Sequence, residues 1–345
     1  MREGQFIRQN ETKWKGIEQS IKQPQVHPDV LAGHFIELTD DLAYAKTFYP
    51  DGESVKFLNN LARLYHQKIY ANKKEDKTRF YWFWQFDLPM LFYRYRKIFL
   101  YSFCFFLFFL LLGIISAKYD EGFVRLIMGD AYVNMTIANI EKGNPFGVYQ
   151  SAGQLEMFFA IAINNIRVAF LSYVSGIVLG VGPVFMNMQN SIMLGAFEYF
   201  FFSRNLGWDS ISVIFIHGTL EIWSIVIAIA SGMILANGLL FPGTYSRGEA
   251  LRRSGLDGMK IVFGLTPLFL LAAFLESFVT RYANMPMPFK LAILGGSLAF
   301  LIWYFIIYPY RLHKKVQGAT DNPSYINYKP NQFQQWLQQR SASVA

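Results

Sequence analysis

Two side chains capable of chemistry stand inside an apolar run of the sequence. Residues 216–224 read IHGTLEIWS, which places His217 and Glu221 four positions apart. In a helix, that spacing turns both side chains to the same face. A histidine and a carboxylate there could form a hydrogen-bond network between helices, bind a solute, or supply two ligands to a metal ion. The elements that position the two residues decide between these chemistries.

The composition indicates that these elements lie in a membrane. Of 345 residues, 53% are hydrophobic and 18% are aromatic, which is more than an ordinary soluble core contains. Five apolar stretches approach or exceed the roughly 20 residues that cross a hydrocarbon core of about 30 Å. They cover residues 98–117, 157–186, 211–240, 261–279 and 291–308. The sequence therefore predicts an all-α, polytopic membrane helix bundle over residues 98–310.

A sixth apolar stretch, 192–202, reaches only about 17 Å as a helix. We expect either a half-helix covered by its neighbours or a helix that continues through polar ends. Lysines and arginines gather before the first stretch, within 241–260 and after the last stretch. Because such charges favour the cytoplasmic side, about six crossings with both termini cytoplasmic fit the pattern. Residues 118–156 then form an outer loop and residues 241–260 an inner loop. The candidate functional residues of the inner loop are Pro242, Gly243, Arg247, Arg252 and Arg253.

Three further segments flank the bundle. Residues 1–79 show amphipathic helical spacing and predict a cytoplasmic helical domain. Residues 80–97 are dense in aromatic rings and end in Arg and Lys, which is typical of a helix in the headgroup region; the alternative is a hydrophobic interface that covers the amino-terminal helices. Residues 311–345 are polar and predict a mobile cytoplasmic tail. The single cysteine, Cys104, excludes an intrachain disulfide framework.

Polar residues from four expected spans fall at one depth, in the outer half of the membrane. They are Asn164, Asn165, Arg167, Glu198, His217, Glu221 and Glu276. An unpaired charge at that depth is costly, so we expect Arg167 to pair with Glu198, Glu221 or Glu276. We also expect His217 to link Asn164 or Asn165 to Glu221. The sequence thus predicts an intramembrane polar cluster.

The cluster is open to three interpretations: a structural network, a site for a bound or translocated solute, and metal-dependent hydrolysis. The last is disfavoured because His217 and Glu221 supply only two ligands and no HExxH motif is present. Phosphate-binding glycine loops, GxSxG elbows and nucleic-acid motifs are also missing from the sequence. We therefore expect no enzyme activity, no metal, no cofactor and no nucleic acid.

Several glycines in the spans predict close helix packing rather than a nucleotide fingerprint. Gly176 and Gly180 form a small-xxx-small pair within GIVLGVG, and Gly195 and Gly218 stand inside other apolar segments. Because glycine costs a helix about 1 kcal/mol relative to alanine, we expect Gly218 to serve a close approach between spans.

The segments NNIRVAFLSYVSGIVLGVGPVFMNMQNSIMLGAF and HGTLEIWSIVIAIASGMILANGLLFPGTYSRGEALR resemble the stage II sporulation protein M family. The matching positions are Asn165, Arg167, Asn190, Gly195, His217, Gly218, Glu221, Pro242, Gly243 and Arg247. The resemblance implies an integral protein of the bacterial inner (cytoplasmic) membrane that assembles partners in the cell envelope. In bacteria that make no spores, it implies a MoxR-type ATPase system as a partner.

These observations lead to two expected functions. The first is an inner-membrane assembly or scaffold protein that organises partner proteins, with the anionic inner leaflet as its lipid partner. The alternative is a transporter or channel-like protein for a solute that uses the outer-half polar site. Homo-oligomer formation is compatible with both expectations. A water-filled cavity that reaches the cluster would favour transport, and a dry network with complete hydrogen bonding would favour the scaffold.

Overall fold

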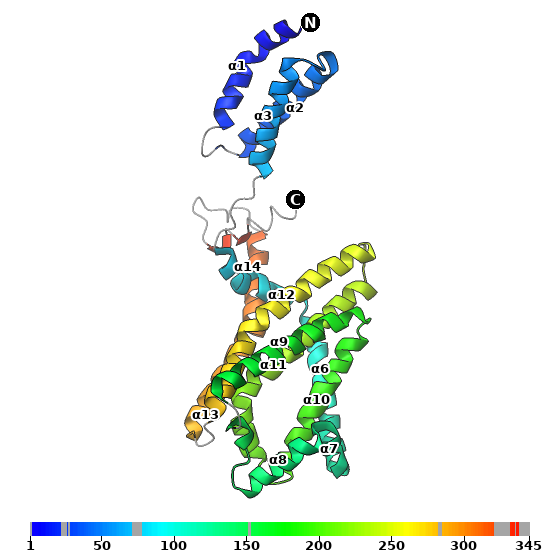
Figure 1. The fold of residues 1–345 in the computed structure, drawn as a ribbon, viewed down its shortest axis with the longest axis vertical. Coiled ribbons are helices and arrows are strands. Elements are labelled where there is room, and N and C mark those ends of the chain that lie inside the picture. Colours follow the sequence, from blue (N-terminus) through cyan, green and yellow to red (C-terminus); the bar gives the residue numbers. More distant parts are fainter. Residues whose placement is uncertain are drawn as a thin grey trace. The chain divides into compact units, whose positions relative to one another are not determined.

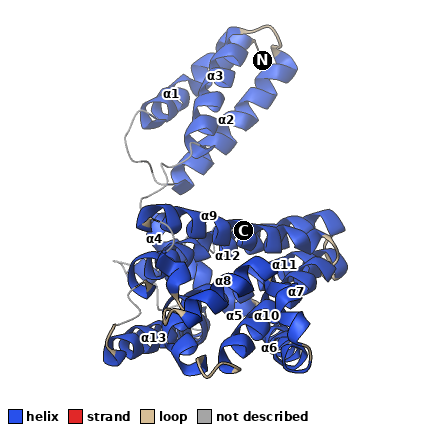
Figure 2. Cartoon of the chain, turned by 60° about the horizontal axis from the view of Figure 1, so that its bottom comes forward, coloured by secondary structure: helices blue, strands red, loops and turns tan. Residues whose placement is uncertain are grey.

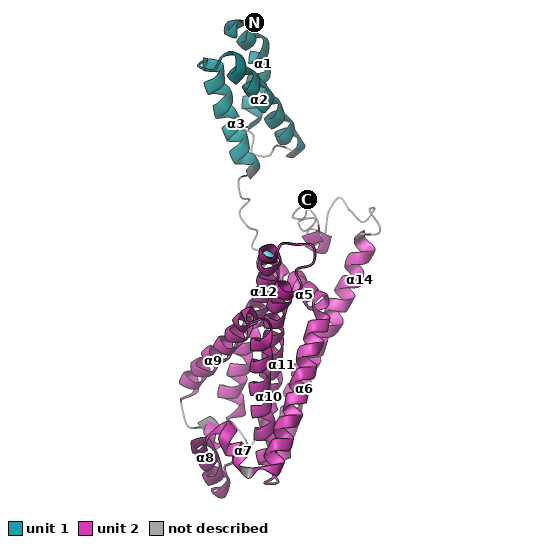
Figure 3. Ribbon diagram, turned by 90° about the vertical axis from the view of Figure 1, so that its right-hand side faces the viewer, with its two compact units in different colours: residues 1–79 teal, residues 80–345 magenta. Residues whose placement is uncertain are grey.

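The computed structural model describes residues 2–21, 26, 28–70, 78–150, 153–281, 285–320, 332–334 and 336–337. All regular structure in these ranges is helical, and none of the described residues forms a strand (Figure 2). The predicted all-α fold is confirmed. The chain divides into two compact units, Met1–Arg79 and Phe80–Ala345, which are coloured separately in Figure 3.

The first unit consists of three helices: α1 (Glu3–Ile21), α2 (Pro28–Phe48) and α3 (Glu53–Tyr70). Their apolar faces bury Trp14, Leu38, Leu58 and Tyr65. Polar tips of these aromatic rings are also paired, since Trp14 Nε1 donates to Asp41 at 2.8 Å and the Tyr65 hydroxyl donates to Ile17 O at 2.8 Å. The unit therefore has its own core with directional bonds that fix the helix register.

The second unit contains the membrane bundle (Figure 1). Its long helices are α6 (Arg96–Tyr119), α9 (Gln154–Val174), α10 (Val181–Phe202), α11 (Gly207–Leu240), α12 (Arg247–Phe274) and α13 (Met287–Ile302). The π-helical segment η4 (Leu275–Thr280) extends α12, and η5 (Trp303–Ile307) joins α13 to α14 (Tyr308–Thr320). Five helical stretches of the described chain are long and apolar enough to cross a membrane: Arg96–Tyr119, Gln154–Ile177, Gly207–Leu240, Arg247–Thr280 and Met287–Ala319.

The helix α10 is the sixth long element of the bundle. It contains 22 residues, and at 1.5 Å per residue it extends about 33 Å. The short apolar stretch 192–202 is thus the second half of a full-length helix that continues through polar residues, which is one of the two predicted forms. This accounts for a bundle of six long helices, of which five meet the apolarity expected of a span.

A tight turn separates α9 from α10 and corrects the predicted span 157–186. The chain leaves α9 through a 3₁₀ turn, Ser175–Ile177, and reverses at Leu179 and Gly180, whose φ angles are 49° and 86°. The turn residues are apolar, so they carry no polar signal that would mark a break. Gly180 therefore provides a left-handed turn position instead of the predicted helix-packing face.

Other glycines permit close contact between helix backbones. A Cβ on Gly176 would collide with Gly232 O in α11, and one on Gly195 would collide with Leu110 O in α6. Gly113 of α6 makes the reciprocal approach to Ile192 of α10. Side chains cannot separate these helices, so the crossings are held by direct backbone contact.

The segment before the first span packs into the bundle on one face. It comprises α4 (Thr78–Trp82), η1 (Phe83–Asp87) and α5 (Leu88–Arg94). Leu88 and Phe92 are 1% and 2% exposed, within the same core cluster as Ile261 of α12. The location of this segment in the headgroup region stays a prediction. The structure shows that one face of the segment is buried against the spans.

The predicted mobile tail is wrong for the residues that the structure describes. Residues 311–320 belong to α14, and Phe333 and Trp336 are buried against Trp82 and Phe86. Trp336 Nε1 donates to Asp87 Oδ1 at 2.9 Å. The aromatic side chains of a Gln-rich segment have no periodic pattern, which is why the contact was missed. Residues 321–331 and 338–345 lie outside the described residues.

The predicted outer loop contains two helices, α7 (Glu121–Met128) and α8 (Asp130–Glu141), and a 3₁₀ turn, Gly147–Gln150. Val124, Val133 and Phe146 join a buried cluster with Phe200 of α10 and Val213 of α11. This end of the bundle is consequently covered by folded chain.

The opposite end collects the positive charges. Arg94 of α5 pairs with Asp257 of α12 at 2.9 Å, and the Tyr308 hydroxyl of α14 donates to Gln85 O at 2.8 Å. The starts of α6 and α12 and the end of the last long helix are therefore neighbours, as an even number of crossings requires. The membrane side that this end faces stays a prediction.

Candidate functional site

A cavity of about 430 Å³ lies between α9, α10, α11 and η4 on the side of the bundle covered by α7 and α8. Its walls are mainly apolar. The polar lining residues are Tyr132, Asn164, Asn165, Asn190, Ser191, His217, Glu221 and Glu276. Five of the seven residues of the predicted cluster thus share one space, namely Asn164, Asn165, His217, Glu221 and Glu276.

His217 is held between two groups of η4. Its side chain is buried, its Nδ1 is 2.9 Å from Thr280 Oγ1, and its Nε2 is 3.9 Å from Glu276 Oε2. The predicted link from His217 to Asn164 or Asn165 is therefore wrong. The histidine instead connects α11 to η4, because the residues nearest its two ring nitrogens, Thr280 and Glu276, both belong to that segment.

Glu221 completes a compact trio with His217 and Glu276. One ligand-capable atom from each of the three residues lies within 4.8 Å of the other two. His217 and Glu221 come to one face through their i, i+4 spacing in α11. Glu276 and Thr280 come from the π-helical segment Leu275–Thr280, and such segments frequently occur at functional sites.

Asn165 is the buried amide of the cavity. The residue is 4% exposed and adjoins the Glu221 carboxyl, yet its Nδ2 makes no hydrogen bond of normal geometry within the described part of the chain. A buried donor without a partner costs on the order of 1–3 kcal/mol. The bundle therefore maintains a polar group here at the expense of stability.

Two members of the predicted cluster lie elsewhere. Arg167 is exposed and makes no ion pair among the described residues, so the predicted pairing with a carboxylate is wrong. Two residues along a helix turn a side chain by about 200°, which places Arg167 away from the face of Asn165. Glu198 accepts a hydrogen bond from Ser210 at 3.3 Å and does not line the cavity.

Gly218 also differs from its prediction. A Cβ at this position would meet only Ile222 and Ile214 of the same helix, at 3.6 and 3.8 Å. No second span approaches it, so the expected close crossing is wrong. Gly218 lines the cavity instead, and its missing side chain leaves space next to His217.

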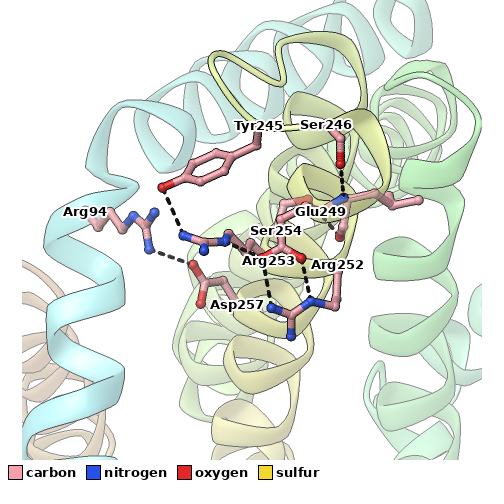
Figure 4. Close-up of polar contacts among 9 residues, drawn as sticks. Arg94, Tyr245, Ser246, Glu249, Arg252, Arg253, Ser254 and Asp257 are labelled. Atoms are coloured by element: carbon pink, nitrogen blue, oxygen red, sulfur yellow. Dashed lines mark hydrogen bonds and ion pairs between the residues drawn. The ribbon is translucent and has the colours of Figure 1, made fainter. Parts of the chain in front are cut away.

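The predicted inner loop is mostly helix. Only residues 241–246 are non-helical, Gly243 has a φ of 63°, and α12 begins at Arg247. Figure 4 shows that Ser246 caps this helix and that Glu249 bridges Arg252 and Arg253, at 2.8 and 2.7 Å. Two of the loop cations therefore share one carboxylate, which compensates one of their two charges. Ser246, Glu249 and the two arginines are not among the residues that line the cavity.

Sequence reasoning missed Thr280, Tyr132 and Ser191 as site residues. Thr280 follows Glu276 by four positions, so the segment ESFVT carried a usable spacing signal. Tyr132 comes from the predicted outer loop and had no such signal.

The fold and the cavity together define a polytopic helical membrane protein with an ionisable site between its spans. The chain matches Stage II sporulation protein M over residues 102–281, which is about half of its 345 residues, so it belongs to that family. Residues 4–71 match a domain of unknown function, DUF8413, within the first compact unit. No curated protein and no solved structure matches the chain.

Proposed function

We propose that this member of the stage II sporulation protein M family binds a small cation in the intramembrane cavity and moves it across the membrane. The observation that supports the proposal is the cavity of about 430 Å³ around His217, Glu221 and Glu276. Carriers place their polar sites between spans.

The charge of the lining favours a cation. Glu221 and Glu276 contribute two carboxylates, whereas no Lys or Arg is found among the described residues that line the cavity. Arg167, the nearest candidate in sequence, forms no ion pair with them in the described chain. Carboxylates in apolar surroundings require compensation, and a bound cation supplies it.

Water access to the cavity provides the test. In a Cys104→Ser background, Asn164→Cys places a thiol in the cavity lining and Ile163→Cys places one at the adjacent, exposed apolar position. Maleimides react with the thiolate, which forms in water and not in lipid. We expect a membrane-impermeant maleimide to label Asn164→Cys and leave Ile163→Cys unmodified. Equal labelling of both, or of neither, contradicts the proposal.

An assembly role is a second candidate, carried by the separate core of the first unit. The cavity between the spans does not require the three-helix unit, whereas binding of a partner protein would give that unit a role. Removal of residues 1–79 should then abolish co-purification of a MoxR-type ATPase while the bundle still inserts. Retention of the ATPase by the shortened chain contradicts this role.

The proposed location is the bacterial inner membrane, with both termini cytoplasmic and no catalytic activity of its own. The positive end of the bundle supports this orientation. Tags at Gln5 and Arg253 should be inaccessible from outside intact cells, whereas a cysteine at Gln150 should be labelled. Labelling at Arg253 would require a different orientation.

A further inference from the structure

We propose that His217, Glu221 and Glu276 form a binding site for a divalent transition-metal ion such as Mn²⁺ or Zn²⁺. The proposal deepens the cation site above and rests on it, because the metal ion is the class of cation that the cavity takes. Sequence reasoning counted two ligands and expected no metal. The third ligand, Glu276, reaches the site from another helix.

The distances suit a metal ion of this size. Ligand atoms about 2.1 Å from a tetrahedral ion lie about 3.4 Å from one another. His217 Nε2 and Glu276 Oε2 are 3.9 Å apart, and the ligand atoms of the trio all lie within 4.8 Å. Metal binding would require the two glutamate side chains to rotate so that their oxygens approach the ion by the remaining distance.

Thr280 orients the imidazole as a supporting residue of a metal site does. When Nδ1 carries the proton, it donates to Thr280 Oγ1 at 2.9 Å, and Nε2 is directed as a lone-pair donor toward Glu276. Histidines that ligate metals almost always place their second nitrogen in such a hydrogen bond.

Asn165 is an independent observation that points to a ligand. It lines the cavity with 4% exposure and adjoins the Glu221 carboxyl, and its Nδ2 makes no hydrogen bond of normal geometry within the described residues. Buried amides almost always have a partner. Of the seven buried side-chain atoms without a hydrogen bond in the described chain, Asn165 Nδ2 is the one that belongs to a cavity-lining residue, so we infer that a group bound in the cavity accepts from it. A water molecule on the metal ion would accept from this amide.

The ligand set selects the class of ion. Two carboxylates balance a divalent charge, whereas a single monovalent cation would leave the site negative. Calcium and magnesium prefer oxygen ligands alone, and an imidazole shifts the preference to Mn²⁺, Fe²⁺, Co²⁺ or Zn²⁺. An organic cation would not need a histidine whose orientation is fixed by Thr280.

The site can be tested on the full-length chain purified in mild detergent and freed of metal with a chelator. Equilibrium dialysis against Mn²⁺ or Zn²⁺ should give one saturable site per chain. We expect Glu276→Gln and His217→Gln to weaken binding at least tenfold, and Thr280→Val to weaken it about tenfold through the orientation of His217. Glu198→Gln is the matched control, because Glu198 is a carboxylate outside the cavity.

Size-exclusion profiles establish that each variant is folded, and the glutamine variants keep the size and polarity of the replaced groups. If His217→Gln fails to fold, Glu276→Gln decides the result. Absence of saturable binding in the wild type, or equal losses in Glu276→Gln and Glu198→Gln, overturns the proposal. Metal binding without uptake by proteoliposomes would support the site and contradict transport, whereas methylammonium uptake that depends on Glu221 without metal binding would support transport and contradict the metal site.

Discussion

Two of the groups of buried polar residues in the described part of the bundle differ in how their hydrogen bonds are satisfied. In the first group, Asn187 Nδ2 donates to Ser102 O at 2.9 Å, and Ser102 Oγ donates to Val226 O at 2.8 Å. This network joins α6, α10 and α11 and is fully buried. In the second group, Asn165 Nδ2 makes no hydrogen bond of normal geometry within the described residues, and two carboxyl groups face a cavity.

The contrast separates structural from functional polarity within one membrane protein. Helix connectors stabilise only when each buried donor finds an acceptor. The network at Asn187 meets this condition, and the cavity around Asn165 does not. The cavity therefore costs stability that a purely structural arrangement would retain, which supports its assignment to ligand binding.

Glycine replacement should give the largest effect on stability. Gly195→Ala drives a Cβ into Leu110 O, a backbone atom that cannot move alone, and we expect a loss of about 3 kcal/mol or the loss of the folded bundle. Gly218→Ala is the matched change at the cavity. It should be neutral or stabilise by up to about 1 kcal/mol, because alanine favours the helix and only flexible side chains lie nearby.

Thermal unfolding of the two variants in detergent measures this difference. If Gly218→Ala destabilises the chain as much as Gly195→Ala does, the cavity wall is as closely packed as the α6–α10 crossing, and the contrast fails.

Replacement of the two buried asparagines by leucine should give the next largest effect. Asn187→Leu removes the side-chain donor to Ser102 O in α6 and should cost about 0.5–1.5 kcal/mol, the net contribution of a hydrogen bond. Asn165→Leu removes a donor that makes no hydrogen bond of normal geometry within the described residues, so stability should be unchanged or higher while ligand binding falls. Urea or thermal midpoints and a binding assay on the same preparations check both halves. Similar destabilisation by both changes would show that Asn165 belongs to a structural network.

A third, smaller effect concerns Glu3, a carboxylate of the first compact unit whose oxygens accept hydrogen bonds. Glu3 accepts from Ser54 N at 3.1 Å and Ser54 Oγ at 2.8 Å, and these bonds lower the pKa of Glu3 below its ordinary value of 4.5. A lowered folded-state pKa stabilises the unit above the unfolded pKa, and this contribution is lost as pH falls through the folded value. The isolated unit 1–79 should therefore lose stability below about pH 4.5, and Glu3→Gln should remove part of that dependence. An unchanged pH profile in Glu3→Gln contradicts this assignment.

Depth along the membrane was predictable from the sequence, whereas direction around each helix was not. Matching depth places Asn165, His217, Glu221 and Glu276 together, and the structure brings them to one cavity. Arg167 has the correct depth as well, but it lies about 200° around α9 from Asn165. The hydropathy pattern indicates how deep a residue lies in its span. It indicates only weakly to which side the residue points when the helix is apolar on all sides.

Two further features could not be predicted from the sequence: the break between α9 and α10, and the π-helical end of α12. The reversal at Leu179 and Gly180 uses apolar residues and one positive-φ glycine, which look like a continuing span. The π-helix at Leu275–Thr280 depends on its packing, since nothing in the segment LESFVT breaks an α-helix. Both features bring polar groups to the cavity, so the site could be predicted in part and its geometry could not.

Uptake by proteoliposomes tests the central claim most directly. Vesicles that contain the full-length chain would be loaded with a metal-sensitive dye and exposed to Mn²⁺, with Glu221→Gln, Glu276→Gln and Glu198→Gln compared at equal protein content. We expect Mn²⁺ uptake by the wild type and by Glu198→Gln, and an uptake rate at least tenfold lower in the two cavity variants. Equal rates in wild-type vesicles and protein-free vesicles, or equal losses in all three variants, would contradict it.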